Sequence, residues 1–196
     1  MFHPDSEMRT VSSDVGVGVF ATSFIPAGTI MYFEDKLDVK ISPDDPLYHD
    51  ARYRVLIHKY AYTDANGIWT LSWDNAKYVN HCCYSNTIST GFGFDIALRD
   101  IAAGEEITDQ YGLYCFLEEE EMDLSCHYSN DCRKRLRVDD IERYCEQWDA
   151  QIKRALQQLP LVNQPLMQYL DAEIDHDLAN YFKTGEGYPT VCSLKL

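Results

Sequence analysis

The sequence predicts a mainly β fold with a helical C-terminal region, and thus an α+β architecture overall. Up to about Tyr111, short apolar segments alternate with turns rich in Gly, Pro and Asn, which is typical of many short strands rather than βαβ units. From Asp139 onward, apolar residues recur at three- and four-residue steps, as they do on one face of a helix. We therefore divide the chain into residues 1–114, 115–138 and 139–196.

Three strands are predicted near the start of the chain. In the first, Val15–Ala21, glycines alternate with apolar residues, and glycine lets another group approach the backbone closely. Taken by itself, this segment suggests a glycine bulge in an edge strand. A turn at Pro26–Gly28 precedes the second strand, Thr29–Phe33. A third strand with one buried face is indicated by the alternation of polar residues with Leu37, Val39 and Ile41.

The middle of the chain indicates a hairpin and two further strands. Residues 47–59 predict a short helix or an irregular insert. The turn Asp64–Gly67 contains an Asn-Gly pair, which suits positive φ angles and therefore a hairpin. Alternation over Phe92–Leu98 is typical of a half-buried strand. The predicted strands of this region are residues 60–63, 68–71, 92–98 and 105–108.

Two amphipathic helices are predicted after the strands. The first is capped by Asp139 or Asp140, and Pro160 ends it. The second begins near Asn163 and Pro165 and stops by Gly185. Their core-forming stripes are Ile141, Tyr144, Cys145, Trp148, Ile152, Ala155, Leu156 and Leu159, then Leu166, Leu170, Ile174, Leu178 and Phe182.

The charge of the chain bears on its partners. The formal net charge is −15, from 32 acidic and 17 basic residues. Direct nucleic-acid binding is disfavoured because it depends on clustered Lys and Arg. A basic polypeptide is the electrostatically matched partner, and the alternative is that the acidity only keeps the protein soluble. No apolar stretch approaches the roughly 18 residues of a membrane span, so we expect no membrane partner.

The cysteines and the first residues bear on the compartment. The 7 cysteines are odd in number and irregularly spaced, which argues against a secreted disulfide framework. The first ten residues show no signal-peptide pattern. We expect a reducing, intracellular location, cytoplasmic or nuclear.

Two motifs carry the chemistry. Tyr78–Asn86 reads YVNHCCYSN, and its amide and imidazole groups donate and accept hydrogen bonds in fixed planes, which suits holding a flat heterocycle or a backbone crossing. Gly104–Tyr111 reads GEEITDQY and ends in a phenol directly after a strand. With the Gly-x-Gly strand upstream, these segments resemble, in order, the motifs of the SET-domain protein-lysine N-methyltransferases. The resemblance covers about Val15–Tyr111 and implies the pseudo-knotted SET-domain β-clip fold with a C-terminal helical cap.

The same resemblance implies a function. S-adenosyl-L-methionine is the expected cofactor, and a lysine side chain of a protein or peptide is the expected methyl acceptor. Methyl transfer is an in-line displacement by a neutral amine, so it needs alignment above all. Tyr111 is the expected catalytic residue, with its hydroxyl beside the transferring methyl group and the lysine nitrogen. Besides Tyr111, the expected cofactor contacts are Asn80 and His81 at the adenosine end and Gly16, Val17 and Gly18 near the methionine moiety.

Two departures from the family pattern stand out. Asp109 occupies a position where the family usually has an aromatic residue, which tunes how many methyl groups the lysine receives. Because this residue differs, the alternative function is a non-catalytic SET module that binds a protein partner. Residues 115–138 resemble a degenerate post-SET segment. The family's zinc site takes three cysteines from this segment and one that matches Cys83, but only Cys126 and Cys132 match, and Tyr128 replaces the third. His127 or Cys115 could complete a set of four ligands, but neither has the family's spacing, so we predict no bound metal.

Overall fold

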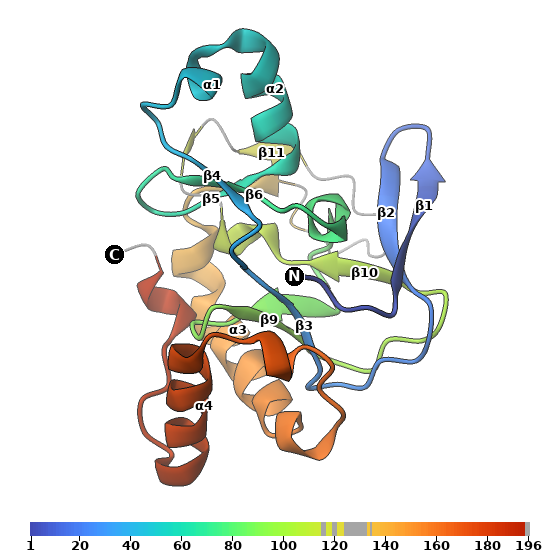
Figure 1. The fold of residues 1–196 in the computed structure, drawn as a ribbon, viewed down its shortest axis with the longest axis vertical. Helices are drawn as coiled ribbons and strands as arrows, with labels where there is room; N and C mark the ends of the chain where they lie inside the picture. The colour runs from blue at the N-terminus through green and yellow to red at the C-terminus, as the bar shows by residue number, and fades with distance from the viewer. Residues whose placement is uncertain (115–116, 119–120, 124–132, 134, 195–196) are drawn as a thin grey trace.

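The structure is a computed structural model that describes residues 1–114, 117–118, 121–123, 133 and 135–194. Strands lie in the middle of the molecule, with α2 (Ala51–Tyr60) at one end and both α3 (Asp140–Leu156) and α4 (Ala172–Thr184) at the other (Figure 1). The predicted mainly β fold with a C-terminal helical region is confirmed. Within these described residues, no helix has the length and apolar character to cross a bilayer.

The first sheet brings together distant parts of the chain. Its order is β1 (Ser6–Ser12), β2 (Gly16–Ala21), β10 (Glu106–Asp109) and β7 (Asn80–His81). β1 has no counterpart among the predicted strands. Because β2 pairs with β1 on one side and β10 on the other, the prediction of an edge strand was wrong. β7 is the short strand at the far side, and it runs parallel to β10.

The second sheet is antiparallel and lies at the centre of the core. Its order is β3 (Ile30–Phe33), β9 (Phe94–Ala97) and β8 (Thr87–Ser89). All four residues of β9 are buried, whereas the alternation predicts a half-buried strand. Both faces of β9 are covered, because Phe94 and Ile96 pack in the core shared with α3 while Ala97 belongs to a second apolar cluster.

The third sheet pairs β4 (Val39–Ile41), β6 (Trp69–Leu71) and β5 (Tyr62–Thr63). The predicted hairpin between β5 and β6 is confirmed, and Gly67 in its turn has φ of 75°. The helical option for the insert is also confirmed, by α1 (Pro46–His49) and α2. Only Ile41 of the predicted apolar face is buried, against Ile57 and Trp69. Leu37 and Val39 are exposed, since this small cluster covers only the end of β4.

The C-terminal helices pack on the second sheet and share its core. The α3 stripe packs in the core as predicted, with Tyr144 half-buried, and it shares one apolar cluster with residues of β3, β8 and β9. α3 ends at Leu156, one turn before the 3₁₀ segment η4 (Leu159–Leu161) that contains Pro160. Two shorter described strands, β11 (Met122–Asp123) and β12 (Arg135–Leu136), form a two-stranded sheet.

The predicted start of the second helix was wrong. α4 begins only at Ala172, after the 3₁₀ segment η5 (Met167–Tyr169), although it stops at Gly185 as predicted. The Gln164 side chain explains the difference. It donates to the carbonyl oxygens of Gly28 (2.8 Å) and Leu159 (3.0 Å) and accepts from the Ile30 amide (2.9 Å). These bonds hold this segment against β3 in a non-helical conformation.

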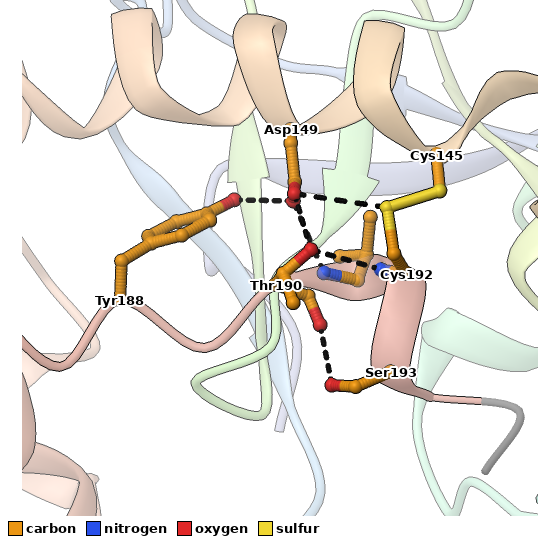
Figure 2. Close-up of a disulfide and its surroundings, with 7 residues drawn as sticks. Cys145, Asp149, Tyr188, Thr190, Cys192 and Ser193 are labelled. Atoms are coloured by element: carbon orange, nitrogen blue, oxygen red, sulfur yellow. Dashed lines mark hydrogen bonds between the residues drawn. A yellow bond between two sulfur atoms is a disulfide. The ribbon is translucent and has the colours of Figure 1, made fainter.

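A disulfide between Cys145 and Cys192 joins α3 to the 3₁₀ segment η6 (Val191–Ser193), as Figure 2 shows. The cysteine pattern argued against a disulfide framework, and this bridge departs from that expectation. The two cysteines lie 47 residues apart, so only the packing of η6 on α3 brings them together. Beside the bridge, the buried Asp149 carboxylate accepts from the Tyr188 hydroxyl (2.6 Å) and the Val191 amide (3.0 Å).

Candidate active site

The two sequence motifs meet where β7 runs parallel to β10. In this pairing Asn80 lies opposite Thr108, and His81 lies opposite Asp109. Asn86 secures the contact, because its Oδ1 accepts from the Thr108 amide (2.8 Å) and its Nδ2 donates to the Glu106 carbonyl oxygen (2.8 Å). The planar Asn86 amide thus supplies hydrogen-bond partners for two buried backbone groups where the two segments cross.

The Asn80 side chain links this crossing to β2. Its Nδ2 donates to the Glu106 carboxylate (2.8 Å) and to the Val17 carbonyl oxygen (3.1 Å). A Cβ on Gly18 would lie 2.5 Å from Glu106 Oε1 and 2.8 Å from Asn80 Nδ2, so this contact requires glycine. Gly16 and Val17, in contrast, are exposed at the start of β2, and Gly16 has open space around it.

His81 ties the crossing to the tyrosine motif. Its Nδ1 accepts from the Tyr111 amide (3.2 Å), its Nε2 lies 3.4 Å from Cys83 Sγ, and its ring packs against the Tyr111 ring with centroids 5.4 Å apart. Burial, with the positive charge of Arg133 as a smaller cause, lowers the pKa of His81 to about 3. The imidazole is therefore neutral at physiological pH.

Tyr111 follows β10 in the 3₁₀ segment η2 (Tyr111–Leu113). Its hydroxyl donates to the Val79 carbonyl oxygen at 2.5 Å. Burial raises the pKa of this phenol, and the carboxylates of Asp109 and Glu106 raise it further, so the hydroxyl stays protonated. The residue also lines a cavity of about 480 Å³, to which no residue of β2 contributes.

Among the described residues, six tyrosine and tryptophan side chains from several elements line the cavity. They are Tyr32 on β3, Tyr60 at the end of α2, Tyr62 on β5, Trp69 on β6, Tyr111 and Tyr114. The rings of Tyr62 and Tyr114 pack with centroids 5.0 Å apart. No single segment of the sequence contains this set, so the cavity is a product of the tertiary fold.

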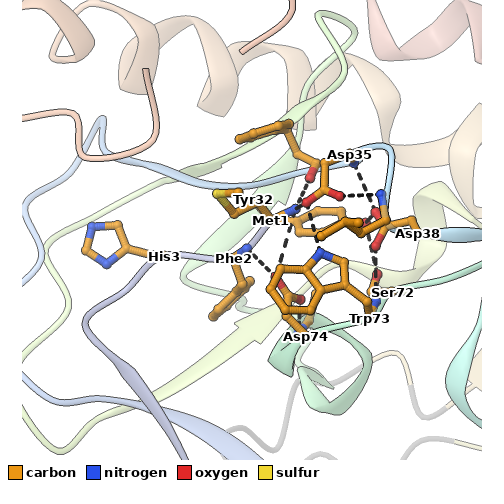
Figure 3. Close-up of polar contacts among 12 residues, drawn as sticks. Met1, Phe2, His3, Tyr32, Asp35, Asp38, Ser72, Trp73 and Asp74 are labelled. Atoms are coloured by element: carbon orange, nitrogen blue, oxygen red, sulfur yellow. Dashed lines mark hydrogen bonds and ion pairs between the residues drawn. The ribbon is translucent and has the colours of Figure 1, made fainter. Parts of the chain in front are cut away.

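A polar network fixes Tyr32 in the wall (Figure 3). The Tyr32 hydroxyl contacts Asp38 Oδ2 and Ser72 Oγ, each at 2.9 Å. The Asp38 carboxylate also accepts from the Trp73 amide (3.1 Å), and the Phe2 amide donates to Asp74 (2.6 Å). These contacts join β3, the loop between β6 and the 3₁₀ segment η1 (Asn75–Tyr78), and the N-terminal residues around one side of the cavity.

Two buried carboxylates, Asp95 on β9 and Asp109 on β10, also line the cavity. Ser89 Oγ donates to Asp95 and contacts the Tyr114 hydroxyl. Burial raises the pKa of Asp95 to about 6. Burial raises the pKa of Asp109 well above its usual range, and repulsion from Asp95 adds to the shift. Sequence reasoning did not identify Asp95, because the alternation over Phe92–Leu98 places it on the strand face that was predicted to be exposed.

Comparison with known proteins now identifies the fold. The family model for the SET domain matches residues 16–112. The chain belongs to the SET-domain family. A search of curated proteins finds no match. The matched residues include both motifs and lie within the predicted unit 1–114.

Solved SET-domain structures overlap with part of the chain. A humanized mutant of the Chaetomium thermophilum Polycomb Repressive Complex 2 bound to an inhibitor is 22% identical with a TM-score of 0.40, over 56% of this chain and 15% of that chain. A candidate histone methyltransferase of Plasmodium falciparum is 21% identical with a TM-score of 0.41, over 56% of this chain and 94% of that chain. The family assignment rests on the matched residues 16–112.

The SET-domain site therefore has two parts that meet at Tyr111. The predicted cofactor residues Asn80, Gly16, Val17 and Gly18 gather where β2 and β7 flank β10, and His81 connects them to Tyr111. Of the predicted site residues, Tyr111 lines the cavity on the other side. Cys126 and Cys132 lie outside the described residues. Among those described, no group of three or more His, Cys, Asp or Glu side chains has an arrangement that holds a metal.

Proposed function

We propose that this SET domain transfers a methyl group from S-adenosylmethionine to a lysine side chain of a protein substrate. One observation carries the proposal. The parallel contact of β7 with β10 places Tyr111 against the Asn80–His81 segment, and the same Tyr111 lines a cavity with aromatic walls. Methyl transfer requires the cofactor and the amine to be aligned, so one residue must contact the binding regions of both.

The residues around Gly16 fit a cofactor of this kind. Gly16 and Val17 are exposed, a ligand meets no side chain at Gly16, and the Asn80 amide lies within hydrogen-bond distance of the Val17 backbone. A ligand lying along this strand end therefore meets backbone polar groups and one side-chain amide. When bound, S-adenosylmethionine supplies a methyl group on a positively charged sulfonium.

His81 and Tyr111 serve alignment in this proposal. Because the imidazole is neutral, it places no positive charge near a sulfonium, and its bond to the Tyr111 amide fixes the backbone that carries the phenol. The Tyr111 proton is committed to the Val79 carbonyl oxygen. The phenol oxygen is therefore available as an acceptor for an amine N–H, which orients the amine lone pair toward the methyl group.

The substrate we propose is a lysine-bearing protein segment, of basic character to match the net charge of −15. The aromatic wall of the cavity matches the alkyl stem of lysine, which buries its methylene groups readily.

A second candidate function is a SET module that binds a protein partner without transferring methyl groups. Asp95 and Asp109 favour it, because carboxylates in the cavity stabilise the ammonium form of an amine, whereas attack requires the neutral form. Calorimetry with S-adenosylmethionine separates the two functions, since the binding module does not need the cofactor.

The decisive experiment is incubation with S-adenosylmethionine labelled in the methyl group and a lysate of the source cell. We expect label in methyl-lysine, identified by amino-acid analysis and mass spectrometry. Tyr111→Phe and Asn80→Ala should each abolish most transfer while leaving the circular dichroism spectrum unchanged. Tyr181→Phe, at a phenol on α4 that does not line the cavity, is the matched control and should keep full activity. Near-normal transfer by Tyr111→Phe would contradict the site assignment.

A further inference from the structure

An arginine from outside the matched segment reaches the turn that carries Tyr111. Arg133 lies beyond residues 16–112, and its side chain is only 13% exposed. Its Nη2 donates to Oε1 of Gln110, the residue directly before Tyr111. The same Oε1 accepts from the amide of Gly112 (3.2 Å), the residue directly after Tyr111. Gln110 is 2% exposed, so a buried side-chain amide connects Arg133 to this turn.

One face of α3 fixes the position of the Arg133 guanidinium. Its Nη1 donates to Asp140 Oδ2 (2.8 Å), and the group lies over the rings of Tyr144 and Trp148, 5.1 and 5.8 Å from their centroids. Asp140, Tyr144 and Trp148 are spaced four residues apart, so they lie along one side of the helix. A planar guanidinium that donates to two acceptors and stacks on two rings has little freedom to turn.

The same helix face packs on the backbone that follows Tyr111. A Cβ on Gly112 would lie 2.8 Å from Trp148 Cη2 and 3.0 Å from Arg133 Nη1. The absence of a side chain at this position therefore lets α3 and the guanidinium approach the η2 turn closely. Because Tyr111 begins this turn, its main chain is fixed by the contacts of η2 with α3 as well as by the bond from its own amide to His81.

The ion pair between Arg133 and Asp140 is buried, and each partner depends on the other. The Asp140 side chain is 3% exposed, and its Oδ2 also accepts from the Arg137 amide (3.1 Å). Burial raises the pKa of the Asp140 carboxyl, and the positive charge of Arg133 partly offsets this rise. Removing the arginine alone leaves a buried carboxylate without its cation, which destabilises a protein more than replacing both partners does.

We propose that Arg133 is a positioning residue for Tyr111, acting through Gln110 and held in place by α3. Arg133 is not among the described residues that line the cavity, so it acts on the turn that carries the phenol and not on the amine. The inference rests on the proposed function in one respect, namely that the position of the phenol sets the rate of methyl transfer. It follows that the chain beyond residue 112 contributes to the rate as well as to stability.

The test separates positioning from stability by removing the arginine with and without its carboxylate partner. Arg133→Met should lower the melting temperature, because it leaves the Asp140 carboxylate unpaired. In the double variant Arg133→Met/Asp140→Asn the melting temperature should recover, since the asparagine carries no charge and keeps an oxygen that accepts from the Arg137 amide. Both variants should nevertheless transfer methyl groups slowly, because neither supplies the donor that holds Gln110.

Initial rates are measured on the full chain with labelled S-adenosylmethionine and a fixed amount of source-cell lysate. We expect the double variant to lose about 10- to 100-fold in maximal rate, the loss that a small misplacement of a reacting group produces, while the apparent KM for S-adenosylmethionine changes little. Arg133→Lys keeps a positive charge beside Asp140 and should fold, but it should also lower the rate, because one ammonium does not reproduce the two-pronged geometry of a guanidinium. Arg143→Met removes an exposed arginine of α3 and should leave the rate unchanged.

A second readout needs no methyl transfer. In ¹H–¹⁵N NMR spectra recorded without S-adenosylmethionine, the amide signals of Tyr111 and Gly112 should shift in the double variant and in Arg133→Lys, but not in Arg143→Met. Unchanged amide signals in the double variant, or a wild-type rate in either the double variant or Arg133→Lys, would overturn the inference. Shifted signals in a protein whose wild-type form transfers no methyl group would contradict only the proposed function.

Discussion

Asp95→Asn is expected to make the protein more stable at neutral pH. Burial raises the pKa of Asp95 from 3.8 to about 6. A group with a raised pKa in the folded state favours folding only while it is protonated, so wild-type stability falls as pH rises from about 4 to about 6. A shift of roughly two pKa units corresponds to about 3 kcal/mol. The Asn side chain keeps an oxygen that accepts from Ser89 Oγ but cannot ionise, so it removes this loss.

Urea unfolding at pH 4 and at pH 8, without reductant, measures this difference. At pH 8 the variant should be more stable by up to about 3 kcal/mol, which corresponds to roughly 6–12 °C in melting temperature for a chain of this size. At pH 4 the two proteins should be nearly equal. Asp175→Asn is the control for removing an acidic side chain. A stability gain that is equal at both pH values, or a loss of stability at pH 8, would refute the reasoning. Either result would mean that ionising Asp95 does not destabilise the folded protein.

Three further predictions follow from the same contacts. Gly18→Ala should lower the free energy of unfolding, measured by urea unfolding, by about 1–3 kcal/mol, because the added Cβ would lie 2.5 Å from Glu106. Gly16→Ala is the comparison: it lies in open space but has φ of 88°, and it should lower the free energy of unfolding by about 1 kcal/mol in the same assay. Reduction of the Cys145–Cys192 bridge should lower the free energy of unfolding by about 2–5 kcal/mol, measured by thermal unfolding with and without reductant. A variant with both cysteines replaced by alanine is the control, and reductant should not change its stability. Asp109→Phe should raise the rate of methyl transfer from S-adenosylmethionine, because removing a carboxylate from the cavity favours the neutral amine, and an unchanged rate in the methyl-transfer assay would contradict this role of Asp109.

Local patterns in the sequence determined much of the fold and one side of the site. The Asn-Gly turn predicted the β5–β6 hairpin because that pair adopts positive φ at low cost. The stripe from Ile141 to Leu156 predicted α3, since a period of 3.6 residues needs no distant contact to be recognised. The two motifs predicted the family and the place of Tyr111, because their residue order is itself the signal.

Only the tertiary structure decided how these elements combine. β2 became an interior strand because β1 and β10 pair on both of its edges, and α4 starts late because Gln164 binds β3 and η4. The cavity draws its tyrosines and its two carboxylates from β3, β5, β9, β10 and the segments around them, and the disulfide joins cysteines 47 residues apart. Turn residues and periodicity are local and can be read along the chain, whereas strand pairing, burial, charge pairing and pKa depend on neighbours that only folding brings together.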